Sequence, residues 1–171
     1  KLTDYVKNLM ISRARVVAGA QNKISLLLRY MKKYEQDRHI LVYCGSTKTE
    51  DKEQQEEIRQ IDLITKQLAV KLHMKVARFT SSENRKEREV LIEKFTEGEE
   101  IQTLVAIKCL DEGVNIPAIK TAFILASTTN PKEYIQRRGR VLRLSPGKEY
   151  AEIYDFVTLP RELDMVSFLN E

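Results

Sequence analysis

The run of five residues from Ile40 to Cys44 constrains the fold of this chain more than any other segment. It reads Ile-Leu-Val-Tyr-Cys, and Gly45 closes it. It contains no charged or amide side chain, so apolar residues do not alternate with strongly polar ones. Such a run is typical of a strand that is buried on both faces. Because helices cover both faces of a parallel sheet, the run predicts an α/β fold.

Other short segments, rich in β-branched or aromatic residues, predict further strands. They occupy residues 75–79, 103–107, 121–125 and 150–156. Helical patterns separate most of these strands, and such units join by right-handed crossovers into a mostly parallel sheet. The prediction is a three-layer α/β/α domain that binds its ligands at the carboxyl ends of the strands.

Apolar residues at three- and four-residue intervals predict the helices of the first half of the chain. Residues 1–38 indicate two helices that are interrupted near Gly19. The charged stretch 48–57 is expected to be the solvated leading turn of a long amphipathic helix that reaches Leu72.

Capping residues predict where the later helices begin and end. Ser82 is the expected N-cap of a helix over residues 83–97 that ends at Gly98. Asn130 followed by proline is expected to begin a helix that Gly139 stops after Arg138. A last helix is expected after residue 160.

Length and composition limit the classes of protein. The 171 residues, of which 42% are hydrophobic, suit one domain with a core, and the net charge of +4 permits a polyanionic partner without requiring one. The apolar runs are far shorter than the ~20 residues of a membrane-spanning helix. Cys44 and Cys109 are the two cysteines, each in or beside an apolar run. We therefore expect core thiols, no disulfide framework, no metal site, no membrane and a cytoplasmic location.

None of the six glycines lies in a phosphate-binding loop pattern. Gly147 and Lys148 resemble the end of such a loop, but Leu142 stands five positions before Gly147 and Glu149 follows Lys148. The chain therefore combines the expected architecture of a nucleotide enzyme with no means of holding a triphosphate by itself.

The segment from Gln136 to Arg143 contains four arginines. One interpretation is the basic end of a surface helix, which the helix dipole favours. In the other, Gly139 lets the chain leave the helix sharply, and Arg140 and Arg143 project toward one phosphoryl group. Arginines placed in this way contribute about 10³ to 10⁵ in rate in phosphoryl transfer generally.

This segment resembles the last motif, QxxGRxxR, of superfamily 2 helicases and translocases. Other segments resemble further motifs of the same C-terminal RecA-like domain, in the family's order. Residues 41–46 are similar to its fourth motif, residues 79–95 to a segment that contacts the nucleic-acid backbone, and residues 104–117, reading LVAIKCLDEGVNIP, to its fifth motif.

The resemblance implies a RecA-like C-terminal domain over residues 39–171, with residues 1–38 as a helical lead-in. In this family, ATP and Mg²⁺ are held mainly by an N-terminal RecA-like domain that carries the phosphate loop. The chain begins at Lys1 rather than at a methionine, and we expect it to be a piece of a longer ATP-dependent helicase or translocase. By itself, it is expected to be inactive.

The resemblance also implies roles for residues at the nucleotide. Arg140 and Arg143 would reach the γ-phosphate as arginine fingers, and Gln136 would help to order the same site. Gly113 would lie against the nucleotide. Asn115 stands where many relatives have an aspartate near the ribose, so a hydrogen-bonding oxygen is kept and the charge is lost.

Nucleic acid is the implied partner. Gln136, the DEGVNIP stretch and the Ser-Thr-Thr-Asn-Pro stretch resemble the DNA-acting repair and restriction-type enzymes more than the DEAD-box RNA helicases, which favours DNA over RNA. Ile107 departs from the family, because many relatives have a phosphate-binding threonine there. The candidate contacts to the nucleic-acid backbone are Ser46, Thr47, Thr80, Ser81 and Lys108. The residues from Thr80 to Ser82 also have the composition of a helix cap, which is the competing interpretation.

Two other functions remain open at this point. The same fold could be a non-catalytic module that docks nucleic acid or protein, and the departures at Ile107 and Asn115 favour it. The joint presence of Gln136, Arg140 and Arg143 opposes it. A phosphate-handling enzyme complete in itself lacks an identifiable nucleophile, base or phosphate loop.

Overall fold

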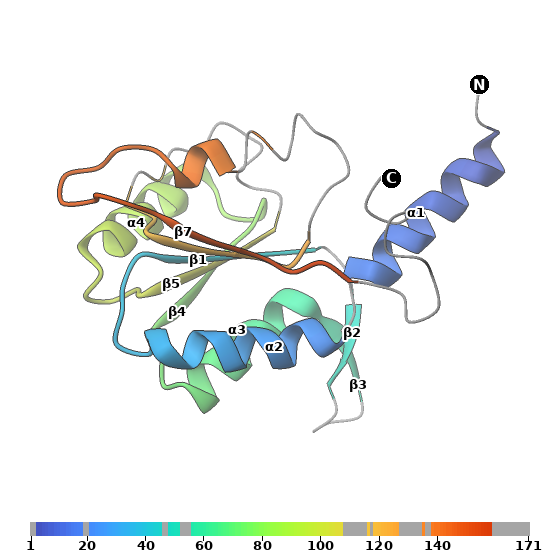
Figure 1. Ribbon diagram of the computed structural model, residues 1–171, viewed down its shortest axis with the longest axis horizontal. Coiled ribbons are helices and arrows are strands. Elements are labelled where there is room, and N and C mark those ends of the chain that lie inside the picture. The colour runs from blue at the N-terminus through green and yellow to red at the C-terminus, as the bar shows by residue number, and fades with distance from the viewer. Residues whose placement is uncertain are drawn as a thin grey trace.

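The computed structural model describes residues 3–18, 21–45, 48–51, 56–107, 116, 118–126, 135 and 138–158 (Figure 1). Its centre is a five-stranded sheet in the order β4-β5-β1-β6-β7. The strands are β1 (Ile40–Cys44), β4 (Val76–Phe79), β5 (Thr103–Ile107), β6 (Thr121–Ile124) and β7 (Glu152–Asp155). All neighbours pair in parallel, as the alternating pattern predicts.

The central strand, β1, is buried on both faces, as its composition predicts. It pairs with β5 on one side and with β6 on the other, so that Ile40 lies beside both Thr103 and Thr121. Each of its five side chains is at most 2% exposed. The two neighbours satisfy the backbone hydrogen bonds of β1, and helices cover its faces.

Helices cover both faces of the sheet and give three layers (Figure 1). On one face, α2 (Gln21–Met31) and α3 (Gln60–Lys71) pack against residues such as Val42. On the other face, α4 (Arg85–Glu97) packs through Phe95 in a second cluster that contains Leu41. The alternation of side chains along β1 therefore divides the core into two clusters, and the predicted three-layer α/β/α architecture with a parallel sheet is confirmed.

Two helices precede β1, as predicted. The first, α1 (Asp4–Ala18), extends away from the sheet in Figure 1, and its Tyr5 side chain is 73% exposed. The second, α2, buries Leu27 and Met31 completely in the core, and a short 3₁₀ turn, η1 (Lys32–Tyr34), follows it. Within the described ranges, no helix is both long enough and apolar enough to cross a bilayer.

The charged stretch after β1 is not the helical turn predicted from its composition. Strand β2 (Lys48–Asp51) pairs antiparallel with β3 (Glu56–Arg59), and α3 begins at Gln60. A helix over these residues would lack an apolar stripe to bury against the sheet. A strand pair needs no such stripe to satisfy its backbone, and Thr49 is the register partner of Ile58 in this pair.

The N-cap of α4 is Asn84, and the prediction of Ser82 is wrong. The Asn84 Oδ1 atom accepts a bond from the Glu87 backbone N–H at 3.1 Å, and the Glu87 carboxylate accepts one from the Asn84 N–H at 2.8 Å. This reciprocal capping box satisfies two N–H groups, whereas a cap at Ser82 would have Arg85 three residues later, which offers no acceptor to return a bond. The helix ends as predicted at Gly98, whose φ of 76° is left-handed.

Some predicted features lie outside the described residues. These are most of the helix expected over residues 130–138, the helix expected after residue 160, and Cys109. Cys44 is described and buried, and its thiol donates to the Ala106 carbonyl over 3.6 Å. The expectation of a core thiol is confirmed there.

We expect Asn84→Ala to lower the free energy of unfolding by about 1–2 kcal/mol, because alanine has no side-chain acceptor for the Glu87 N–H. Ser82→Ala, the matched control at the position that the sequence favours, should cost less than half as much. Denaturant unfolding of the two variants measures the difference. Equal losses would contradict the assignment of the cap.

Candidate functional site

The described part of the chain contains four of the ten residues predicted for the site. These are Arg140, Arg143, Thr80 and Ser81. The remaining six lie outside it, namely Gln136, Gly113, Asn115, Ser46, Thr47 and Lys108.

The carboxyl ends of the five parallel strands define one edge of the sheet, where α/β proteins bind ligands. Thr80 directly follows β4, and Asp155 is the last residue of β7. Ile107 ends β5 beside Cys44 of β1. The sheet therefore directs the segments that follow these strands toward a common side.

The segment of residues 138–143, which we call the arginine segment, begins in a helix and continues past its end. Residues 138–141 are helical, and the Leu142 N–H donates to the Arg138 carbonyl at 3.0 Å. Val141 is 1% exposed and belongs to the core cluster of α4. Burial of this side chain ties the segment to the sheet.

Gly139 does not stop the helix, contrary to the prediction. It lies within the helical residues, and a Cβ added to it would meet nothing within 4 Å. Val141, two residues farther on, is still helical and is buried in the core, so the helix continues past Gly139. Arg140 therefore lies in the last helical turn, and Arg143 lies just after it.

An ion pair connects the arginine segment to the last strand. The Arg138 Nη2 atom lies 2.9 Å from the Asp155 Oδ2 atom, and the two side chains are 34% and 17% exposed. Lys23 of α2 approaches from the opposite layer and donates to the Leu125 carbonyl at 2.7 Å. Burial lowers the pKa of Lys23, and the negative charge of Asp155 acts in the opposite direction. Asp155 therefore has cationic groups from both helical layers around it.

Lys148 bonds to the other end of the same segment. Its Nζ atom donates to the Val141 carbonyl at 2.5 Å and to the Arg143 carbonyl at 2.8 Å. Burial lowers the pKa of this ammonium group. Sequence reasoning considered Lys148 only as part of a phosphate loop, and it did not single out Asp155 or Lys23. An aspartate that ends a predicted strand at the ligand edge is the one signal that could have indicated Asp155.

The polar groups of Thr80 form a small network with the residues that follow it. The Thr80 N–H donates to Glu83 Oε2 at 2.6 Å, and its hydroxyl lies 3.0 Å from both carboxylate oxygens. The Ser82 N–H donates to the Thr80 hydroxyl at 3.1 Å. Arg88 donates to the Thr80 carbonyl at 3.1 Å, above the ring of Phe79. The donors of Thr80 thus hold an anionic group, the carboxylate of Glu83.

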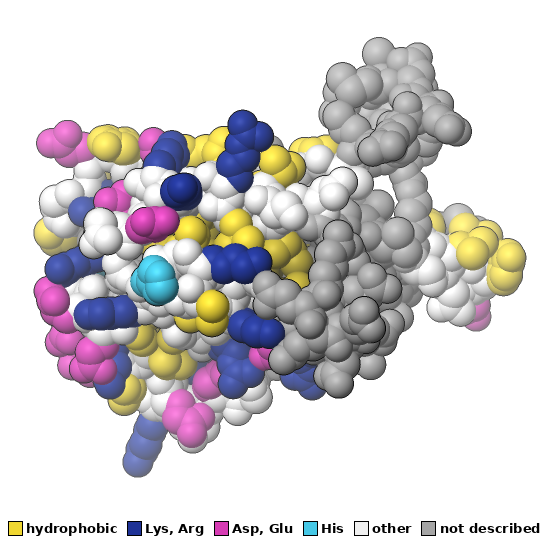
Figure 2. All heavy atoms as spheres, turned by 90° about the horizontal axis from the view of Figure 1, so that it is seen from below, with side chains coloured by type: hydrophobic (Ala, Val, Ile, Leu, Met, Phe, Trp, Pro, Cys, Tyr) yellow, Lys and Arg dark blue, Asp and Glu magenta, His cyan; other side chains and the backbone are white. Residues whose placement is uncertain are grey.

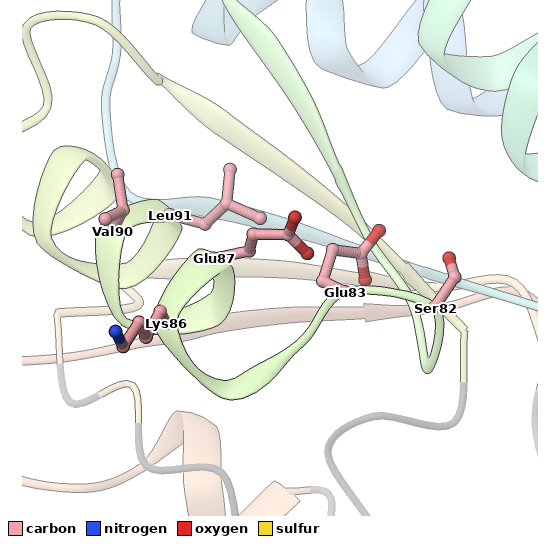
Figure 3. A pocket seen from close by; sticks show the side chains of 6 residues that line it. All are labelled: Ser82, Glu83, Lys86, Glu87, Val90 and Leu91. Atoms are coloured by element: carbon pink, nitrogen blue, oxygen red, sulfur yellow. The ribbon is translucent and has the colours of Figure 1, made fainter.

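A surface hollow adjoins this loop (Figure 3). Its lining consists of Ser82, Glu83, Lys86, Glu87, Val90 and Leu91. Glu83 and Glu87 both accept bonds from backbone N–H groups. In the described parts of the chain, no three His, Cys, Asp or Glu residues gather in a way that could hold a metal ion.

The charges on the face in Figure 2 are mixed in sign. Basic and acidic side chains alternate there with apolar atoms. The field over this face is therefore weak compared with that of a one-signed patch. By contrast, the arginine segment brings Arg138, Arg140 and Arg143 within six consecutive positions.

The chain matches a known family, the helicase conserved C-terminal domain, over residues 22–145. It is 27% identical over 128 residues to the DNA 3'-5' translocase XPB2 of Sulfurisphaera tokodaii, a match that covers 75% of this chain and 25% of that protein. It is 29% identical over 82 residues to putative helicase 22 of a Sulfolobus islandicus filamentous virus, covering 48% of this chain and 15% of that protein. The chain thus spans a quarter or less of these relatives.

Solved structures share the fold. The C-terminal part of the Fun30 ATPase domain superposes with a TM-score of 0.60 at 21% identity, over 81% of this chain and 41% of that one. The Pyrococcus furiosus Hef helicase domain superposes with a TM-score of 0.54 at 24% identity, and the match covers 87% of this chain and 28% of that one. The C-terminal domain of the DEAD-box protein Dbp5 superposes with a TM-score of 0.58 at 18% identity, and the match covers 80% of this chain and 71% of that one.

We expect Gly139→Ala to leave the free energy of unfolding unchanged or to raise it by up to about 1 kcal/mol, because alanine favours a helix and the added Cβ meets open space. Gly98→Ala is the matched comparison. Its backbone is left-handed, and its Cβ would lie 2.8 Å from the Cδ atom of Arg38, so about 1 kcal/mol or more should be lost. Thermal unfolding distinguishes the two. A loss at Gly139 equal to that at Gly98 would show a terminating glycine instead.

Proposed function

Because the chain belongs to the family of helicase conserved C-terminal domains, we propose that it is the second motor domain of an ATP-dependent helicase or translocase that acts on DNA. The observation that carries the proposal is the arginine segment. Its Val141 is buried in the core, and its last helical turn and the residues after it carry Arg140 and Arg143. This arrangement suits guanidinium groups that must meet a phosphoryl group held by another domain.

The proposed partner is an N-terminal RecA-like domain with a phosphate loop, which would hold most of the ATP and Mg²⁺. ATP, when bound, supplies the phosphoryl group that is transferred to water. Arg140 and Arg143 fit this group because planar guanidinium donors match phosphate oxygens and remain charged. We assign them the stabilisation of charge that develops on those oxygens. Gln136 would help to order the site, and Gly113 and Asn115 would line the nucleotide.

Movement along nucleic acid follows from the same contacts. Domain closure would engage Arg140 and Arg143, and hydrolysis would release them. The residues proposed to hold the strand through its phosphates are Ser46, Thr47, Thr80, Ser81 and Lys108. Phosphate contacts position a strand without reading its sequence. The name of the archaeal relative, a DNA translocase, supports DNA over RNA.

The Thr80 network supports a place for a phosphate on this domain. Its N–H and hydroxyl already hold the carboxylate of Glu83, and a phosphate oxygen needs the same donors. A strand that binds here would replace Glu83 as the acceptor. Glu83 then opposes nucleic-acid binding both by occupying these donors and by its negative charge.

The first test uses the protein that carries this domain together with its phosphate-loop domain. We expect Arg140→Ala and Arg143→Ala each to lower DNA-stimulated ATP turnover by about 10³-fold or more, with ATP affinity changed less than tenfold. Arg85→Ala is the control, because Arg85 is 92% exposed and pairs with Glu89 on the surface. Steady-state turnover and nucleotide binding are the measurements.

Turnover at the parent rate in Arg143→Ala would contradict the arginine-finger assignment. A parent protein that binds DNA without any ATP turnover would favour the alternative function, a docking module with a RecA-like fold.

The second test concerns the nucleic-acid contact. We expect Glu83→Gln to raise affinity for single-stranded DNA several-fold, because removal of one charge at contact distance is worth about 1 kcal/mol in water. Thr80→Val should lower the affinity. Glu93→Gln is the charge-matched control, since this exposed residue lies about 12 Å along α4 from its beginning. That distance exceeds the screening length of about 8–10 Å at physiological salt.

Binding is measured by fluorescence anisotropy at fixed salt. If Glu83→Gln and Glu93→Gln change the affinity equally, Glu83 does not compete with a phosphate.

A further inference from the structure

We propose that Lys148 and Asp155 are positioning residues that clamp the arginine segment at its two ends and so determine where Arg140 and Arg143 point. The inference rests on the proposed function, because it assigns these residues a part in the same ATP site. Neither residue belongs to the QxxGRxxR pattern. Both come from the chain after it, from the turn before β7 and from the end of β7.

Lys148 clamps the segment where its helix ends. The last carbonyls of a helix have no partners within the helix, and they form the negative end of its dipole. The Lys148 ammonium donates to two carbonyls in this region, at 2.5 Å to Val141 and at 2.8 Å to Arg143. Because one cation bonds to both, the backbone between Val141 and Arg143 is held in a single turn.

A tight turn directs Lys148 back toward the segment. The Lys148 N–H donates to the Ser145 carbonyl at 3.0 Å. Gly147 adopts a φ of 72°, a conformation that side chains rarely tolerate. Gly147 and Lys148 do not form a phosphate loop. They form a turn that places the ammonium group of Lys148 at the end of the helix.

Asp155 clamps the segment where it begins. Its carboxylate lies 2.9 Å from the Arg138 guanidinium, and it is 17% exposed. A half-buried pair of this kind is screened less by solvent than a surface pair. Asp155 is fixed in turn because it ends β7, where it pairs with Ile124 of β6. The ion pair therefore transfers the rigidity of the sheet to the first helical residue of the segment.

Arg140 lies between these two attachments, and Arg143 carries one of the bonded carbonyls. Guanidinium groups stabilise charge on a phosphoryl group only within a narrow geometric tolerance, and a misplacement of 1 Å can cost about 10²-fold in rate. Loss of a clamp should therefore lower kcat while the domain stays folded. ATP binding depends mainly on the other domain, so KM should change little.

The test compares Lys148→Met, Lys148→Arg and the control Lys71→Met, an exposed lysine that ends α3 on the other face of the sheet. In the two-domain protein, we expect Lys148→Met to lower kcat by about 10²-fold, with KM for ATP within threefold and the unfolding midpoint near that of Lys71→Met. Lys148→Arg should recover most of the rate, because a guanidinium also donates to carbonyls.

A second readout is independent of catalysis. The amide protons of Leu142 and Arg143 bond to the carbonyls of Arg138 and Arg140. Their hydrogen exchange should become at least about tenfold faster in Lys148→Met, while amides of the central strand β1 keep their protection. Lys71→Met should leave all of these rates unchanged.

The other clamp is tested by Asp155→Asn, which keeps the shape of the side chain and removes its charge. We expect about a tenfold lower kcat. Arg138→Gln should lower kcat similarly, and the double variant should be no slower than either single one, because both changes break the same ion pair. Additive losses would overturn this half of the proposal.

Unchanged exchange and unchanged kcat in Lys148→Met would overturn the clamp, as would a loss of kcat that follows a loss of stability in all variants. Failure of the proposed function is recognised separately. It is the case in which Arg143→Ala retains the parent turnover, whatever the exchange rates of the Lys148 variants.

Discussion

The burial of β1 between two parallel neighbours is the constraint on which the rest of the structure depends. Its side chains are apolar on both faces, so helices must cover it above and below, and its backbone bonds must be satisfied by β5 and β6. Parallel neighbours place the carboxyl ends of all strands at one edge of the sheet. The segments that follow β4 and β7, with Thr80 and Asp155, begin at this edge for that reason.

Rigidity at this edge comes from contacts between elements that are distant in sequence. Asp155 of the last strand meets Arg138 of the arginine segment, and Lys23 of α2 approaches from the opposite layer. Lys148 bonds to carbonyls of the same segment. In the proposed function, the domain would present Arg140 and Arg143 repeatedly to a nucleotide held elsewhere. We regard these attachments as the means by which a short segment keeps its geometry between cycles.

The parts of the fold that followed from the sequence are those in which burial dominates. The strand at Ile40–Cys44 could be predicted because a short, continuous apolar run is buried best in a central strand. The structure of the charged residues around Glu56 could not be predicted, because they have no apolar pattern that would distinguish a helical turn from the strand pair that forms there. The cap at Asn84 and the helical conformation of Gly139 were also missed, because in both places the local sequence allows more than one structure. Ser82 and Asn84 are both good caps, and the choice depends on the bond that Glu87 returns.

Periodicity and motif spacing are local along the chain, so the sequence alone was enough to predict the layered parallel fold, the family resemblance and the pattern of Arg140 and Arg143. Only the folded chain shows which residues bond to the segment that carries those arginines. The partners Lys148 and Asp155 lie 7 and 17 positions beyond the residues that they bond, Val141 and Arg138. The sheet brings Asp155 beside Arg138, and the turn that contains Gly147 brings Lys148 to the two carbonyls, so no periodicity or motif spacing could have indicated these bonds.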